Sequence, residues 1–126
     1  MKETYINTLR CENLENPNAV ERETPRLSWV VESKGRNIIQ LSYRILVASS
    51  VEKLSEDVGD LWDSGVVRSS QQNQVFYAGK KLASFKECFW KVILELSDGA
   101  EFEAICSNAA FWKMGILDVA LWQGGY

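Results

Sequence analysis

Apolar and polar side chains alternate along short segments of this chain with a period of two, the pattern of β-strands that bury one face. The clearest such segment is 39–49, in which Ser42 and Arg44 are expected to face solvent. Its expected inward face consists of Leu41, Tyr43, Ile45 and Val47. Segment 87–96 repeats the alternation, with every second residue from Cys88 to Leu96 apolar. We therefore expect a β-sheet protein with long, half-buried strands.

Turn-forming residues divide the rest of the chain at spacings near ten residues. Further strands are expected at 4–12, after Pro25, and at 60–67, 72–77, 101–105 and 109–114. The Asp98-Gly99 pair predicts a hairpin turn. A short helical turn is expected after Ser50, a favourable N-cap, with Leu54 covering the edge of the sheets. With about seven strands and no long crossover helix, the pattern predicts an all-β, antiparallel β-sandwich of two sheets.

Composition narrows the class of protein. The 126 residues suit one domain, and 46% hydrophobic with 25% charged residues is typical of a soluble globular fold. A net charge of -3, with scattered Lys and Arg, argues against nucleic acid as a partner. No apolar run approaches the roughly 20 residues that cross a bilayer, and no leader pattern follows Met1. We therefore expect a cytoplasmic protein or one whose signal peptide has been removed.

Few residues could carry out catalysis. The chain has no histidine, which excludes the Ser-His-Asp and Cys-His nucleophile systems. Cys11, Cys88 and Cys106 have no metal-ligand spacing, and we interpret them as buried or semi-buried thiols. Asp60 and Asp63 are the one carboxylate pair to consider for general acid and base, but aspartates beside Gly and Ser ordinarily stabilise turns. The sequence thus predicts no catalytic, cofactor-binding or metal-binding residue.

The five tryptophans could instead form a platform on which sugar rings stack. Trp29 and Trp90 have the apolar parity of central strands and are expected in the core, while Trp62 is expected to plug the edge of the sandwich. Trp112 follows Phe111, so one of these two rings must face outward or into a neighbouring domain. Trp122 lies in the expected exit from the domain. The charged pairs Glu52-Lys53 and Lys80-Lys81 are interpreted as solvated turns.

Several motifs occur in an order that is specific to one family. The motifs are LRCENLENP (9–17), TPRLSW (24–29), YRILVASS (43–50), GDLWDSG (59–65), YAGK (77–80), CFWKV (88–92) and AFWKMG (110–115). Together they resemble the N-terminal region of bacterial α-L-rhamnosidases, especially those of Bacteroides type, and the resemblance covers essentially the whole chain. It implies an immunoglobulin-like or fibronectin type III-like domain at 1–115, followed by a truncated connection at 116–126.

The resemblance also implies a function for the parent protein. In that family the catalytic carboxylates lie in a separate α/α barrel, and the enzymes are inverting glycosidases that release terminal α-L-rhamnose from glycans or glycosides. It implies that this chain is a non-catalytic module whose partners are the remaining domains, contacted through residues 116–126, in a periplasmic or secreted enzyme. Two alternatives remain, an independent carbohydrate-binding module and a protein-interaction domain. A carbohydrate-binding module would need an exposed aromatic row.

Overall fold

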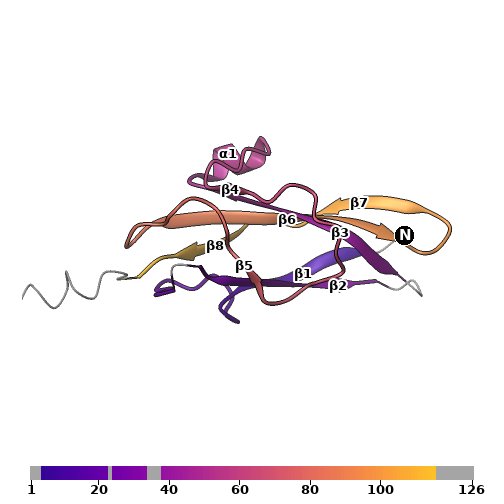
Figure 1. The fold of residues 1–126 in the computed structure, drawn as a ribbon, viewed down its shortest axis with the longest axis horizontal. Helices are drawn as coiled ribbons and strands as arrows, with labels where there is room; N and C mark the ends of the chain where they lie inside the picture. The colour runs from indigo at the N-terminus through magenta and orange to yellow at the C-terminus, as the bar shows by residue number, and fades with distance from the viewer. Residues whose placement is uncertain (1–3, 23, 34–37, 116–126) are drawn as a thin grey trace, which may run out of the picture.

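The computed structural model describes residues 4–22, 24–33 and 38–115, which form two packed β-sheets (Figure 1). The smaller sheet has the strand order β1-β2-β5. Its strands are β1 (Tyr5–Cys11), β2 (Arg26–Glu32) and β5 (Val75–Phe76). β5 has only two residues and forms an edge beside β2, so the strand expected at 72–77 is present but short.

The larger sheet has the order β4-β3-β6-β7, and β8 also pairs with β6. Its strands are β3 (Ile39–Ala48), β4 (Trp62–Asp63), β6 (Glu87–Ser97), β7 (Phe102–Cys106) and β8 (Ala110–Lys113). All pairings between the named strands are antiparallel. The two-sheet antiparallel sandwich expected from the sequence is confirmed.

β7 and β8 pair with successive parts of β6, β7 with its second half and β8 with its first. Ile93 pairs with Cys106 in β7, whereas Trp90 pairs with Ala110 in β8, so the β7–β8 side contains one extra residue between these pairs. Ser107 lies at this bulge, where its N–H donates to the Val92 carbonyl oxygen (2.9 Å) and its Oγ accepts from the Val92 N–H (3.0 Å). The hydroxyl replaces a backbone acceptor that the extra residue displaces.

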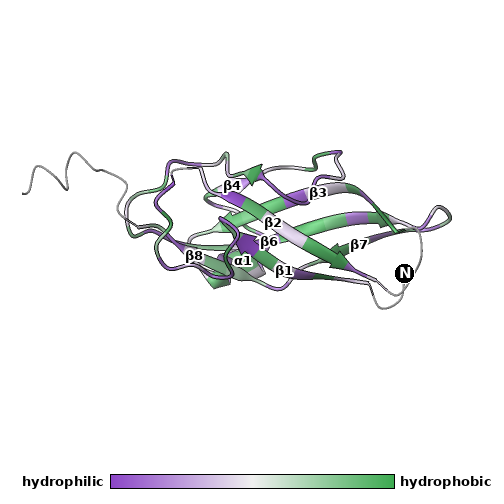
Figure 2. Cartoon of the chain, turned by 90° about the horizontal axis from the view of Figure 1, so that it is seen from below, coloured by the Kyte–Doolittle hydropathy of each residue, from purple (hydrophilic) through white to green (hydrophobic). Residues whose placement is uncertain are grey.

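The inner faces of the two sheets meet in a core that three tryptophans dominate. Trp29 of β2 is 2% exposed, and Trp90 of β6 and Trp112 of β8 are also buried. All five apolar residues expected on the inner face of β6 are buried. The period-two pattern therefore predicted the core of β6 correctly. Figure 2, seen from the side of the smaller sheet, shows that hydrophobic and hydrophilic residues are also interspersed along β2 and β3.

The inward face expected for β3 is wrong at its start. The pairing of β3 with β6 shifts register between Gln40 and Ser42, so Leu41 is only half-buried, and Gln40 and Ser42 are buried. Both polar atoms of the Gln40 side chain have hydrogen-bond partners. Its Oε1 accepts from the Trp29 indole N–H (3.0 Å), and its Nε2 donates to the backbone oxygens of Ser69 and Gln71 (both 2.9 Å). A buried polar residue with such partners costs little free energy.

The expected helical turn is α1 (Val51–Ser55), and the N-cap Ser50 accepts a hydrogen bond from the Lys53 N–H (3.2 Å). Leu54 does not cover the edge of the sheets as expected. It packs on Leu46 and Ala48, on the outer face of the larger sheet, where Figure 1 shows α1. This contact buries two β3 residues that alternation alone would leave exposed.

Candidate functional site

Asp60 and Asp63 do not form a catalytic carboxylate pair. Asp60 accepts hydrogen bonds from the Ser49 N–H (2.9 Å) and hydroxyl (2.6 Å), and its ion pair with Lys53 measures 3.3 Å. Burial alone would raise the pKa of Asp60, but the bonds from Ser49 and Lys53 outweigh it and lower that pKa to about 2. Lys53 is exposed, as expected, but it lies in the short helix α1 and has an ion-pair partner that the sequence did not indicate.

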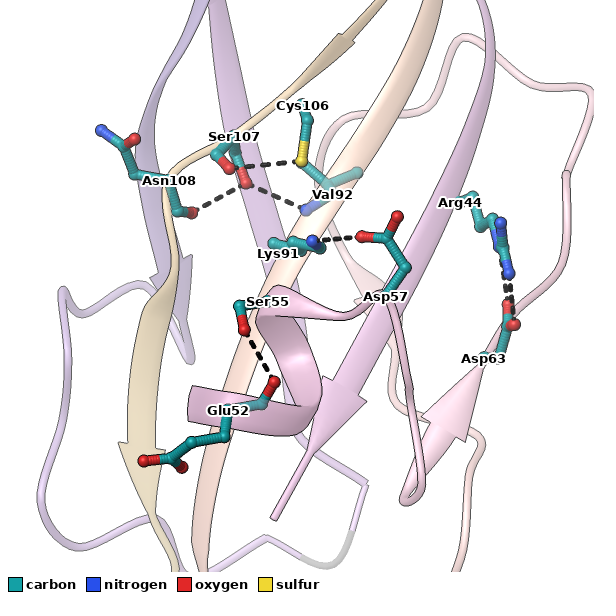
Figure 3. A network of polar contacts seen from close by, with 10 residues as sticks. All are labelled: Arg44, Glu52, Ser55, Asp57, Asp63, Lys91, Val92, Cys106, Ser107 and Asn108. Atoms are coloured by element: carbon teal, nitrogen blue, oxygen red, sulfur yellow. Dashed lines mark hydrogen bonds and ion pairs between the residues drawn. The ribbon is translucent and has the colours of Figure 1, made fainter. Parts of the chain in front are cut away.

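Asp63 has a different partner. The Arg44 guanidinium binds its carboxylate in a bidentate pair, with Nε to Oδ1 at 3.0 Å and Nη2 to Oδ2 at 2.6 Å (Figure 3). The Gly65 N–H also donates to Oδ1 (2.9 Å), and the bonds from Arg44 and Gly65 lower the pKa of Asp63. A general acid at neutral pH needs a raised pKa. Both aspartates are instead ionised and connect turns to strands.

The described tryptophans present no exposed ring for a sugar. Trp29, Trp90 and Trp112 are in the core, and Trp62 is half-buried at the edge strand β4, where its ring meets Tyr77 edge-on at 5.4 Å between centroids. Trp62 therefore lies as expected. Because Trp112 faces inward, Phe111 is the outward ring and packs against Phe89 at 5.3 Å. Trp122 lies outside the described residues.

Four other aromatic rings of the described ranges are more exposed, but they do not form a row. Tyr5 and Phe76 lie beside opposite ends of β2, next to Glu32 and Arg26. Phe102 lies in the other sheet, and Phe85 lies in the loop before β6. A stacking platform needs rings side by side on one face, so these four rings give no support to a carbohydrate-binding surface.

The cysteines and carboxylates form no metal centre within the described ranges, where no three metal-ligating side chains come together. Cys11 and Cys88 are buried, and burial raises the pKa of the Cys88 thiol to about 12, which keeps it protonated and unreactive. Cys106 is exposed, contrary to expectation, because it follows the core-facing Ile105 in the edge strand β7 and so has the outward parity. No helix in the same ranges is both long and apolar enough to cross a membrane.

Two open hollows are lined entirely by described residues. One, of about 190 Å³, lies between β1 and the β7–β8 bulge. The other, of about 240 Å³, lies over Tyr77 and is lined by Thr24, Tyr77, Ala78, Gly79, Lys80 and Lys81. Both are below the roughly 300–1,000 Å³ typical of small-molecule sites. Neither hollow combines a pair of carboxylates with the exclusion of water, so neither has the geometry of a glycosidase active site.

A two-sheet antiparallel sandwich with the strand orders β1-β2-β5 and β4-β3-β6-β7 has the architecture of an immunoglobulin-like domain. Residues 6–118 match the family described as the Rha78A-like, N-terminal immunoglobulin domain, and the chain belongs to that family.

Relatives of known name agree with this assignment. An α-L-rhamnosidase of Formosa agariphila is 39% identical over 107 residues, which are 85% of this chain and 11% of the relative. The solved structure of the Dictyoglumus thermophilum α-L-rhamnosidase matches 94% of this chain with a TM-score of 0.86 and 32% identity. That of the Streptomyces avermitilis enzyme, complexed with L-rhamnose, matches 94% with a TM-score of 0.84 and 32% identity. This chain spans 13% and 11% of those two structures, respectively.

Proposed function

We propose that this chain is the non-catalytic N-terminal structural module of a longer α-L-rhamnosidase. The observation that carries the proposal is the contrast in coverage: enzymes named α-L-rhamnosidase match 94% of this chain but use only 11–13% of their own length to do so. The parent would be an inverting glycosidase that releases terminal α-L-rhamnose from glycans or glycosides, with its catalytic carboxylates in another domain.

The chemistry of the described residues supports a structural role. An inverting glycosidase needs two carboxyl groups about 6.5–9.5 Å apart, one of them protonated before it donates to the leaving oxygen. Asp60 and Asp63 both have a lowered pKa and separate cationic partners. A well-packed sandwich with ion-paired surface carboxylates is suited to bracing neighbouring domains rather than to acid catalysis.

The proposal predicts that the purified chain hydrolyses a chromogenic α-L-rhamnoside no faster than buffer does. Asp60→Asn and Asp63→Asn variants should give the same background rate, because neither carboxylate takes part in the chemistry. The full reading frame that contains this chain should encode further domains, and its product should hydrolyse the same compound. Turnover by the chain alone that either variant abolishes would overturn the non-catalytic role. A full-length product without rhamnosidase activity would overturn the assigned parent enzyme.

A further inference from the structure

The loop 77–86, which joins β5 to β6, lies at the end of the sandwich where β8 finishes. Its backbone is fixed to three other parts of the chain by four hydrogen bonds: Tyr77 N–H to Pro25 O (2.8 Å), Lys80 N–H to Leu61 O (2.8 Å), Phe85 N–H to Gly115 O (3.3 Å) and Met114 N–H to Lys86 O (2.8 Å). The backbone of the loop is therefore held by contacts within this domain.

Two side-chain features hold the first half of the loop in place. The buried Tyr77 hydroxyl donates to the Lys80 carbonyl oxygen (2.6 Å) and lies 3.1 Å from that of Leu61. At Gly79 a Cβ atom would lie 2.4 Å from both the Leu61 carbonyl oxygen and the Trp62 Cβ, so only glycine fits there. A loop with so fixed a backbone loses little conformational entropy when a partner binds.

This loop exposes an aromatic side chain of the kind that anchors protein interfaces. Phe85 is 60% exposed, and its φ of 64° is in the left-handed region, which is unfavourable for any residue with a Cβ. The isolated domain gains little burial from this ring in return. Six other described non-glycine residues also have a positive φ, so the exposure of the ring is what distinguishes Phe85. Large aromatic side chains are common anchors of protein interfaces.

The loop is also basic in an acidic chain. Residues 77–86 include Lys80, Lys81 and Lys86 and no Asp or Glu, whereas the whole chain has a net charge of -3. The ion pairs found among the described residues use other cations, namely Arg26, Arg44, Lys53, Arg68 and Lys91. The three loop lysines are thus available to carboxylates of another domain, and Lys80 and Lys81 line the hollow above Tyr77.

We propose that loop 77–86 is the surface on which the next domain of the parent enzyme docks, with Phe85 as the apolar anchor and the lysines facing acidic side chains. This inference rests on the proposed function. The Gly115 carbonyl oxygen accepts from the Phe85 N–H, and residues 116–126 follow it in the sequence, so a domain after them would be tethered within reach of this loop. A tether raises the effective concentration of the partner, so a small contact area suffices.

The test compares hydrogen-exchange rates of the 77–86 backbone amides in this chain and in the full-length product. We expect exchange to be slower in the full-length product by on the order of tenfold, since docking adds about the free energy of one good contact. Phe85→Ala, and separately Lys80→Glu with Lys81→Glu, should remove this protection. Phe102→Ala is the matched control, because Phe102 is an exposed phenylalanine at the opposite end of β6. It should keep the protection.

A second measurement separates docking from folding. Phe85→Gly relieves the left-handed strain, so it should raise the thermal midpoint of the isolated chain while still removing protection in the full-length product. The docking proposal would be wrong if the 77–86 amides exchanged equally fast in the isolated chain and in the full-length product, or if the protection survived all the loop variants. If the full-length product still hydrolysed rhamnosides, the proposed function would be unaffected by that result. A full-length product with further domains but no rhamnosidase activity would overturn the proposed function and leave docking to be judged by exchange. A reading frame with no further domain would overturn both.

Discussion

At the scale of single residues, the buried polar side chains have hydrogen-bond or ion-pair partners. Lys91, on the outer face of β6, is buried and pairs with Asp57 at 2.5 Å, and Gln40 is bonded at both ends of its amide (Figure 3 shows the first pair). Within the described residues no buried side-chain nitrogen or oxygen lacks a hydrogen bond. Each such contact joins segments distant in sequence, so these residues fix loops to the sheets.

Asp60 gives a prediction about pH. Its pKa is lowered to about 2 in the folded chain, so its contribution to stability is complete above the unfolded value of about 3.9 and is lost as the pH falls through about 2. We expect Asp60→Asn to destabilise the chain at pH 7, because the amide keeps no charge for Lys53. The destabilisation should shrink between about pH 4 and pH 2. Urea unfolding of both proteins across that range measures it.

The comparison with the Asn variant isolates Asp60, because every other carboxylate titrates in both proteins. If the difference in the free energy of unfolding stays constant from pH 7 to pH 2, the charge of Asp60 does not stabilise the fold. The bonds to Ser49 would then act through shape alone.

At the scale of elements, the bulge between β7 and β8 depends on Ser107. The Ser107 Oγ accepts from Val92 N–H (3.0 Å) and is 2.9 Å from the Asn108 carbonyl oxygen (Figure 3). Ser107→Ala should leave the buried Val92 N–H without an acceptor and lower the free energy of unfolding by about 1–3 kcal/mol. Chemical denaturation measures this loss.

Ser55→Ala is the matched control, because the Ser55 hydroxyl also donates to a backbone oxygen, that of Glu52, but in an exposed helical turn (2.7 Å). We expect its effect to stay within about 0.5 kcal/mol. Equal effects of the two substitutions would show that the bulge tolerates an unpaired N–H, for example by admitting water.

At the scale of the whole molecule, the division at residue 115 remains a prediction, because 116–126 lies outside the described residues. That segment carries the apolar side chains of Ile116, Leu117, Leu121, Trp122 and Tyr126. In a chain without its next domain, these side chains should drive self-association, at roughly 25 cal/mol per Å² of apolar surface. Sedimentation should show association of the 126-residue chain that a version ending at Gly115 lacks. Unfolding of the shorter version would instead place the segment inside the domain.

The sequence by itself determined the class of fold and the family. In β6, alternation predicted every inward residue because the extra residues lie on the neighbouring strands, in β3 between Gln40 and Ser42 and between β7 and β8, and β6 itself has none. The Asp98-Gly99 turn follows from local chemistry, since Gly99 has a φ of 97° and the Asp98 carboxylate accepts from two following N–H groups. The order of the motifs pointed to the rhamnosidase family, which the comparisons confirm.

Only the tertiary structure decided which exceptions to alternation occur. Burial of Gln40, of Leu46 beneath α1 and of Ser107 at the bulge depends on partners 11 to 31 residues away or on a packed helix, which a period-two pattern does not encode. The aspartates considered for catalysis also depend on non-local contacts. The identity of Asp60 is visible in the sequence, but its pKa depends on Ser49 and Lys53, which folding brings to it across a turn. Local pattern specifies which face a residue prefers, and non-local contacts specify what that face meets.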